Sequence, residues 1–461
     1  MNAGVTILRQ ARYQAHRQEV GLRVASSLEK SSAVETLAPE PSPRRPFLPI
    51  RLQAGDWLTT FSAFRHYNFR LYFAGLLISV TGTWAQTVAQ EWLVYSLTNS
   101  PLALGQVAFM MAIPVWVAGP WVGVVIDRVP RRTVLLVTQI VQMVQAFALA
   151  ALTFSGHVEV WHVMILSAVQ GLANAFDAPA RQAFAVEMVG KEDLSNAIAL
   201  NSTMFSLARF VGPAIGALIL VTLGTAWAFT INGVTFLAIL ASLLMMRLGK
   251  PLLSQTGQSP LGDLLDGMHF IGQHRTIIAL MAIALAVGLL GSSFNTLTAV
   301  LAQEVLGKGE FEFGMLKTAI GLGSVGGALG VAYLSSRRGR GCWLILLNVI
   351  FPLSLAALAG ASLLGIYELV LLSLVAVGIS FIPQLSLCNM LIQTTIPDGM
   401  RGRVVGVYTL IIFGSFPLGA LIGGAMADQV GAPVTIAVNA AALLLVGQLV
   451  RLAVPDLKAL D

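Results

Sequence analysis

The feature that most constrains this sequence is a series of long apolar runs separated by short polar connections. A helix needs about 20 apolar residues to cross the hydrocarbon core of a bilayer, and only helices and closed barrels satisfy every backbone hydrogen bond there. Only 11% of the 461 residues are charged, whereas a soluble domain carries roughly 25%. The sequence therefore predicts an all-α polytopic membrane protein.

Twelve transmembrane helices are expected, in two halves of six. The expected spans are residues 71–96, 102–126, 132–155, 160–181, 197–221, 226–247, 276–303, 313–335, 342–364, 367–393, 404–427 and 432–454. The longest connection, 248–275, contains an amphipathic piece from Leu261 to Ile271. We accordingly expect a disordered cytoplasmic tail at 1–56, an N-terminal half at 57–247, a central cytoplasmic loop at 248–275 and a C-terminal half at 276–461.

The distribution of basic residues predicts the orientation. With both termini inside, all 28 Lys and Arg residues except Lys308, Lys317 and Arg209 fall on the cytoplasmic side. Lys308 and Lys317 fall outside, and Arg209 lies within a span. Cytoplasmic loops of membrane proteins carry an excess of Lys and Arg, so both termini are expected in the cytoplasm.

Several function classes are disfavoured. The net charge of +6 could suggest nucleic acid, but the basic residues lie in loops between apolar segments. The two cysteines, Cys342 and Cys388, give no disulfide framework and no metal-ligand spacing. The sequence has no phosphate-binding loop and no nucleophile–base pair. We therefore expect no enzyme activity, cofactor or metal.

Pairs of glycines four residues apart recur in every third expected helix. This spacing allows helix backbones to approach closely, and the period is that of halves built from paired three-helix units. The pairs are Gly119/Gly123, Gly212/Gly216, Gly323/Gly327 and Gly419/Gly423.

Polar side chains inside the spans indicate an interior path. Gln170, Asn174 and Asp177 share one helical face with Arg181. Stripes of this kind are costly against lipid and should face a bundle interior or a water-filled cavity. The candidates for ion coupling or for lining a cavity are Glu91, Gln90, Gln170, Asn174, Asp177 and Asn295.

Ionisable residues within the membrane are candidates for function. Arg209 has two interpretations: a gate or substrate contact, or a static pair with Asp177 or another carboxylate, with snorkelling to the cytoplasmic surface as a variant. Glu91 is a candidate proton carrier, or else a residue wetted at the outer mouth. For Asp177 a structural cap or salt bridge before Pro179 competes with a coupling role.

A charged turn follows the second span. In the stretch from Gly123 to Val134, GVVIDRVPRRTV, one carboxylate, Asp127, lies among Arg128, Arg131 and Arg132. The arginines should keep Asp127 ionised, so it suits a breakable cytoplasmic latch better than a proton carrier. A simple topology determinant would explain the arginines but not the acid.

These residues resemble the major facilitator superfamily. The Gly123–Arg132 stretch is similar to the signature of its second loop, with Pro130 where the family often has Gly. The run from Arg209 to Gly216 resembles the antiporter motif of its exporters, with Ala217 where a second Gly is common. Stretches similar to the branch of the enterobactin exporter and macrolide-efflux-like proteins are Asn68–Tyr72, Trp92–Pro101, Asp177–Gln182 and Pro397–Arg403.

The resemblance covers about residues 60–455 and implies alternating access in a bacterial inner membrane. It implies a monomer that exports a small amphipathic molecule (a drug, a siderophore or a related metabolite) by proton antiport. Gly123, Asp127, Arg128, Arg131 and Arg132 would form the cytoplasmic gate. Arg209, Gly212, Pro213 and Gly216 would form the helix-five motif. The alternative function is a lipid translocator, or a membrane scaffold or sensor that transports nothing.

Overall fold

The computed structural model describes residues 61–190, 192–248, 260–335 and 339–460, and every structural statement below concerns these residues. The chain separates into two units, Met1–Thr59 and Thr60–Asp461, and the described residues belong to the second. The predicted tail, 1–56, and residues 249–259 of the predicted central loop lie outside them.

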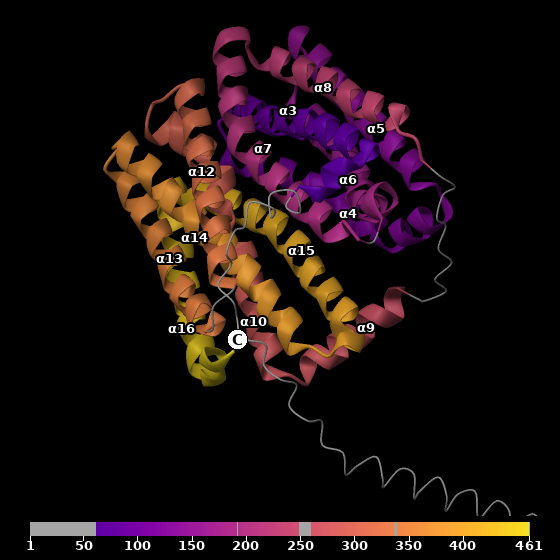
Figure 1. The fold of residues 1–461 in the computed structure, drawn as a ribbon. Helices are drawn as coiled ribbons and strands as arrows, with labels where there is room; N and C mark the ends of the chain where they lie inside the picture. The colour runs from indigo at the N-terminus through magenta and orange to yellow at the C-terminus, as the bar shows by residue number, and fades with distance from the viewer. Residues whose placement is uncertain (1–60, 191, 249–259, 336–338, 461) are drawn as a thin grey trace, which may run out of the picture. The chain divides into compact units, whose positions relative to one another are not determined.

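Six long helices follow one another in the first half (Figure 1). They are α3 (Tyr67–Thr98), α4 (Pro101–Arg128), α5 (Arg131–Phe154), α6 (Val160–Val189), α7 (Leu194–Leu223) and α8 (Thr225–Met245), preceded by the 3-10 helix η1 (Ser62–Arg65). The turn between α3 and α4 shows how the sequence ends one helix and begins the next. Asn99 adopts the left-handed conformation at φ 49°, and Pro101 begins α4, where its missing N–H costs no helical hydrogen bond.

The second half begins with a short helix and a composite span. The helix α9 (Pro260–Gly272) contains the predicted amphipathic piece. Residues 275–305 then form one span of α10 (Arg275–Ala286), the π-helical turn η2 (Val287–Gly291), α11 (Ser293–Val300) and a second π-helical turn, η3 (Leu301–Val305). The remaining elements are α12 (Glu310–Ser335), α13 (Arg340–Leu363), α14 (Tyr367–Thr395), α15 (Asp398–Val430), α16 (Ala432–Ala453) and the 3-10 helix η4 (Pro455–Ala459).

The described helices have the lengths and composition of a polytopic membrane protein. Ten segments, including the composite span, are long and apolar enough to cross a bilayer. The other two long helices, α3 and α6, carry polar side chains along their length and do not reach that hydropathy. With these two added, the described helices are consistent with the twelve predicted spans.

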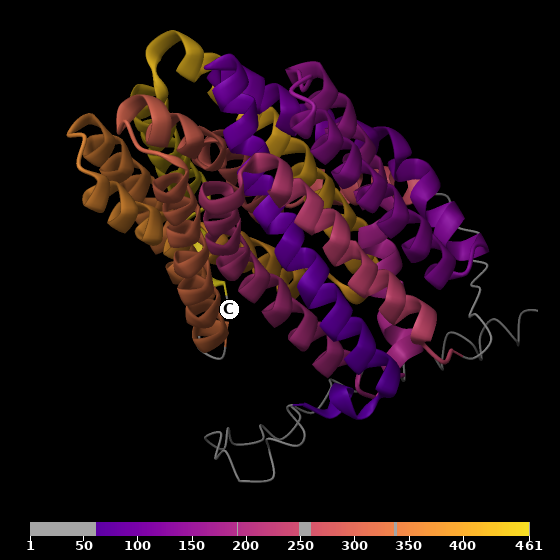
Figure 2. The same cartoon turned by 90° about the horizontal axis from the view of Figure 1, so that it is seen from above.

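Helix pairs build each half and join the two. In the first half, α3 packs against α7 and α8, and α5 packs against α6 and α8; in the second, α12 and α13 pack against α14. Both views show the indigo helix α3 beside the magenta helices of its own half (Figures 1 and 2). The two halves meet where α7 packs against α12 and where α4 packs against α15.

Close glycine contacts confirm the predicted small-residue packing in three of the four helices. A Cβ atom added at Gly216 would lie 2.9 Å from Cα of Ala85 in α3. One at Gly327 would lie 2.6 Å from the Ile379 carbonyl oxygen, and one at Gly419 would lie 2.4 Å from the Gly288 carbonyl oxygen. The expectation is wrong for the second helix, because no atom lies within 4 Å of a Cβ added at Gly119 or Gly123.

Candidate functional site

An ion pair connects the two halves through α3 and α12. Glu91 Oε2 lies 2.5 Å from Lys317 Nζ, and the side chains are 19% and 7% exposed. Lys317 Nζ also donates to the backbone carbonyl oxygen of Asn295 at 2.5 Å and to its Oδ1 at 3.1 Å. An ammonium group has three N–H donors, so Lys317 has an acceptor for each of them. For the Glu91 carboxylate, Lys317 is the partner seen among the described residues.

Lys317 does not lie where the sequence places it. The orientation count assigns it to the outer surface, but it lies inside α12 and is buried. The sequence gives one indication of this position. Lys317 is followed by a long apolar run, and an ionisable residue at such a place is a candidate for function. Its partners, however, come from two other helices that are distant in sequence.

Arg209 is the second cation where the halves meet. Its guanidinium carbon lies 5.2 Å from the centre of the Trp84 ring, on α3, and its Nε atom is buried without a hydrogen-bond partner. Among the described residues no carboxylate pairs with it, so the predicted pair with Asp177 is wrong. On α12, a Cβ added at Gly321 would lie 2.8 Å from the Arg209 carbonyl oxygen.

The helix-five motif packs α7 against α3. A Cβ added at Gly212 would lie 2.4 Å from Cβ of Trp84, so the glycine is needed for the approach of the two helices. Pro213 lies inside α7 and has no N–H for the carbonyl oxygen four residues earlier, which is that of Arg209. The motif therefore leaves this carbonyl without its helical donor at the contact with α12.

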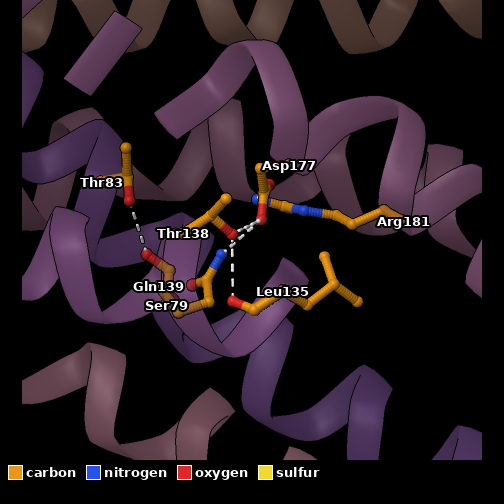
Figure 3. A network of polar contacts seen from close by, with 7 residues as sticks. All are labelled: Ser79, Thr83, Leu135, Thr138, Gln139, Asp177 and Arg181. Atoms are coloured by element: carbon orange, nitrogen blue, oxygen red, sulfur yellow. Dashed lines mark hydrogen bonds and ion pairs between the residues drawn. The ribbon is translucent and has the colours of Figure 1, made fainter. Parts of the chain in front are cut away.

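Asp177 is a buried structural acceptor within the first half (Figure 3). It pairs with Arg181 one turn later and accepts hydrogen bonds from Thr138 Oγ1 at 2.9 Å and Gln139 Nε2 at 2.7 Å. Its side chain is 2% exposed. These contacts fasten α6 to α5, which corresponds to the salt-bridge interpretation.

The other predicted cavity residues lie at different places. Gln90 is next to Glu91 in α3 but takes no part in the ion pair. Its Nε2 donates to Ser167 Oγ of α6 at 3.0 Å. Gln170 is 7% exposed and Asn174 is half-buried, both on α6. Asn295 is exposed. Of these residues, it alone shares the partner of Glu91, because both accept from Lys317 Nζ.

The charged turn after α4 binds neighbouring helix ends. Arg131 Nη1 donates to Glu187 Oε1 of α6 at 2.5 Å, and Arg132 Nη2 donates to the Leu244 carbonyl oxygen of α8 at 3.0 Å. Arg128 is exposed and Asp127 is half-buried. The arginines thus have local structural contacts in addition to any effect on topology.

A second set of polar contacts fastens η1 to the loop before α7. Asp193 accepts hydrogen bonds from Ser62 Oγ at 2.5 Å and contacts His66 Nε2 at 2.8 Å. These hydrogen bonds, first that of Ser62 and then that of His66, lower the pKa of the Asp193 carboxyl below its ordinary value. Sequence reasoning did not identify this contact.

Contacts between the halves gather at the end of the bundle that holds Asn99. Besides Glu91 and Lys317, Tyr95 donates its hydroxyl to Glu304 Oε2 at 2.7 Å, and Ser100 Oγ donates to Asp428 Oδ1 at 3.0 Å. At the opposite end, which holds Asp127, α4 presents Gly119 and Gly123 to open space.

Neither catalytic nor metal chemistry is suggested by this arrangement. In the described ranges no three His, Cys, Asp or Glu side chains gather as a metal site would require. The arrangement instead supplies charges and hydrogen bonds that hold the two helical halves together.

Comparisons with known proteins agree with this architecture. The profile of a family described as "Transmembrane secretion effector" matches residues 58–461. The chain is 27% identical over 396 residues to the multidrug efflux pump Tap of Mycolicibacterium fortuitum, covering 84% of this chain and 95% of the pump. It is 28% identical over 413 residues to the enterobactin exporter EntS of Shigella boydii, covering 87% and 96%. The crystal structure of the nucleoside transporter NupG shares the fold, with a TM-score of 0.68 at 12% identity, covering 84% of this chain and 99% of that one.

Proposed function

We propose that this chain, which belongs to the transmembrane secretion effector family of the major facilitator superfamily, exports small amphipathic molecules by proton-coupled antiport. The family and its relatives are transporters and not enzymes. Tap is named for multidrug efflux and EntS for enterobactin export, so a drug, a siderophore or a related metabolite is the proposed cargo. The proposed setting is a bacterial inner membrane, with a monomer whose termini both lie in the cytoplasm.

The ion pair between Glu91 and Lys317 is the observation that carries the proposal. It lies between halves that must separate for a solute to pass, and it consists of one carboxylate and one ammonium. A proton that binds Glu91 removes the negative charge, and Lys317 then keeps only its hydrogen bonds to Asn295. Proton uptake would thus weaken the tie between the halves, which links a proton gradient to their separation.

The open face of α4 supports a cytoplasmic gate at the Asp127 end of this helix. With the orientation predicted from the basic residues, the Asn99 end is extracellular and the Asp127 end is cytoplasmic. The halves are then joined on the outside, while Gly119 and Gly123 face open space on the inside. Closure of the cytoplasmic end would bring this face of α4 against the second half. Asp127, charged at the end of α4, would hold that closed state as a latch.

Efflux from cells tests the proposal. Cells that express the protein are loaded with ethidium, Nile red or naphthalenesulfonate, which are cationic, neutral and anionic, and efflux is followed with and without a proton ionophore. The proposal predicts efflux of at least one probe, abolished by the ionophore and by Glu91→Gln at equal membrane expression. An efflux rate that is the same with and without the ionophore would contradict proton coupling.

The alternatives give different results in the same cells. A scaffold or sensor would export no probe, and its activity would survive Asp127→Asn and Arg209→Ala. A lipid translocator would move a fluorescent phospholipid between leaflets while exporting none of the three small-molecule probes. Either outcome would overturn export of small amphipathic molecules.

A further inference from the structure

The Arg209 guanidinium is a cation without a counterion in a place where cations are costly. Among the described residues, the other charges well inside the spans have partners: Glu91 pairs with Lys317, and Asp177 pairs with Arg181. Arg209 has the face of Trp84 at 5.2 Å and a buried Nε without an acceptor. A charge held away from water ordinarily has both an ionic partner and hydrogen bonds.

The aromatic contact does not replace a counterion. A cation over an indole ring is attracted by the quadrupole of the ring, but the ring carries no net charge that could neutralise the guanidinium. An arginine carries five N–H donors in a fixed planar fork. Trp84 therefore leaves the guanidinium without an ionic partner, and the buried Nε has no acceptor among the described residues.

The location of Arg209 places these donors at the contact between the halves. Arg209 lies where α7 meets both α3 and α12, because Gly212 contacts Trp84 and Gly321 approaches the Arg209 carbonyl oxygen. Lys317 lies one helical turn from Gly321, on the same side of α12. Among the described residues, two cations, Arg209 and Lys317, thus lie at this contact well inside the spans with one carboxylate, Glu91, whereas Glu304 and Asp428 contact the first half at the Asn99 end. The side chain of Arg209 is partly exposed, so a ligand can reach it.

We propose that Arg209 binds the oxyanion of the transported molecule, so that this protein prefers amphipathic substrates with a carboxylate, sulfonate or phosphate group. Guanidinium and oxyanion groups form parallel hydrogen bonds in a plane. Such a ligand supplies the missing counterion of the guanidinium. The inference rests on the proposed transport function and names its substrate class.

A matched pair of probes tests the charge preference. Naphthalenesulfonate and naphthalenesulfonamide have the same ring and nearly the same shape, but only the first is an anion. Binding of each is measured by calorimetry to the full-length protein in nanodiscs of phosphatidylcholine. The wild type should bind the sulfonate about 10- to 100-fold more tightly, as expected for hydrogen bonds to a charged group. Equal binding, or binding of neither probe, would overturn the proposal.

Variants separate ligand binding from a structural role of Arg209. Arg209→Gln should lose the preference for the sulfonate, while its affinity for the sulfonamide stays unchanged. Arg209→Lys should recover part of the preference, because it restores charge without the planar fork. If Arg209 only held α7 against Trp84, both probes would weaken together in Arg209→Gln, and the preference would remain.

Two further experiments identify the source of the anion and separate a failure of the anion site from a failure of the proposed function. Nanodiscs that contain phosphatidylglycerol show whether a lipid phosphate occupies the site: loss of sulfonate binding there would assign the site to a headgroup and overturn a soluble substrate. Efflux of ethidium, Nile red and naphthalenesulfonate from cells tests export separately. Wild-type efflux of any probe with no sulfonate preference in binding would refute the anion site and leave the exporter intact, whereas wild-type efflux of none of ethidium, Nile red and naphthalenesulfonate would refute the proposed function.

Discussion

Removing Lys317 should open the Asn99 end of the protein far more than removing its partner. Lys317→Met leaves the Glu91 carboxylate without the partner seen in the structure. Breaking a buried ion pair on one side costs about 3–5 kcal/mol. Separation of the halves would hydrate the carboxylate and relieve that cost. At about 1.4 kcal/mol per tenfold change, the equilibrium between closed and open forms should shift roughly 150- to 4,000-fold toward open.

Glu91→Gln should have a smaller effect because Lys317 keeps other acceptors. Two hydrogen bonds to Asn295 remain, and hydrogen bonds to charged groups are worth about 1.5–3 kcal/mol each. We expect a cost of roughly 1–2 kcal/mol and a shift of roughly 5- to 30-fold. The double variant has no stranded charge and should lie within about 1 kcal/mol of the wild type.

The assay is a distance measurement between spin labels on the two halves. Labels are attached through Ser155→Cys, after α5, and Leu364→Cys, after α13; both positions are exposed at the Asn99 end. Cys342→Ser and Cys388→Ala remove the native thiols. The fraction of long distances gives the open population for each variant. Equal shifts for Lys317→Met and Glu91→Gln, or no shift for either, would refute the asymmetry derived from the hydrogen bonds.

The remaining predictions concern the gate, the packing and the lead-in segment. Asp127→Asn should slow efflux at least tenfold at equal membrane expression, and Asp127→Glu less so; unchanged rates for both would leave the charged turn as a topology determinant. Gly216→Leu should lower the free energy of unfolding by about 1–3 kcal/mol through overpacking, because the leucine side chain would meet Ala85. The melting temperature should fall accordingly, and a wild-type melting curve would contradict that contact. The depressed pKa of Asp193 means that its contribution to stability is present above about pH 4 and is lost as pH falls further. Asp193→Asn should therefore lower the melting temperature more at pH 7 than at pH 3, whereas the exposed control Glu192→Gln should have no effect at either; an equal loss at both values would refute the assignment.

The fold could be predicted from the sequence because the bilayer restricts the choices. Apolar runs of spanning length admit only helices, and their boundaries follow from turns such as Asn99 and Pro101. The structure extends some helices beyond the apolar part, as in α6, which continues to Val189, because a helix need not end where the membrane does. The π-helical turns in the span 275–305 left no pattern in the sequence that we could use.

The site was less predictable because its contacts cross between helices that are remote in sequence. Glu91, Asn295 and Arg209 were recognised as polar groups inside spans, but their partners were not. Lys317 lies near the outer end of the expected span 313–335, so the count of basic residues assigns it to the outer side, and its burial against another helix could not be read from the sequence. The partner of Arg209 is an aromatic ring, Trp84, and a search for carboxylates could not find it.

One measurement tests proton-coupled export through Glu91 most directly. The protein is reconstituted in liposomes with an acidic lumen, and uptake of ethidium and of naphthalenesulfonate is compared with that of empty liposomes. We predict that the wild type accumulates at least one of the two probes above its outside concentration. Glu91→Gln should only equilibrate that probe, since no carboxylate exchanges a proton for it. Accumulation by Glu91→Gln at the wild-type level, or none by the wild type, would contradict the account.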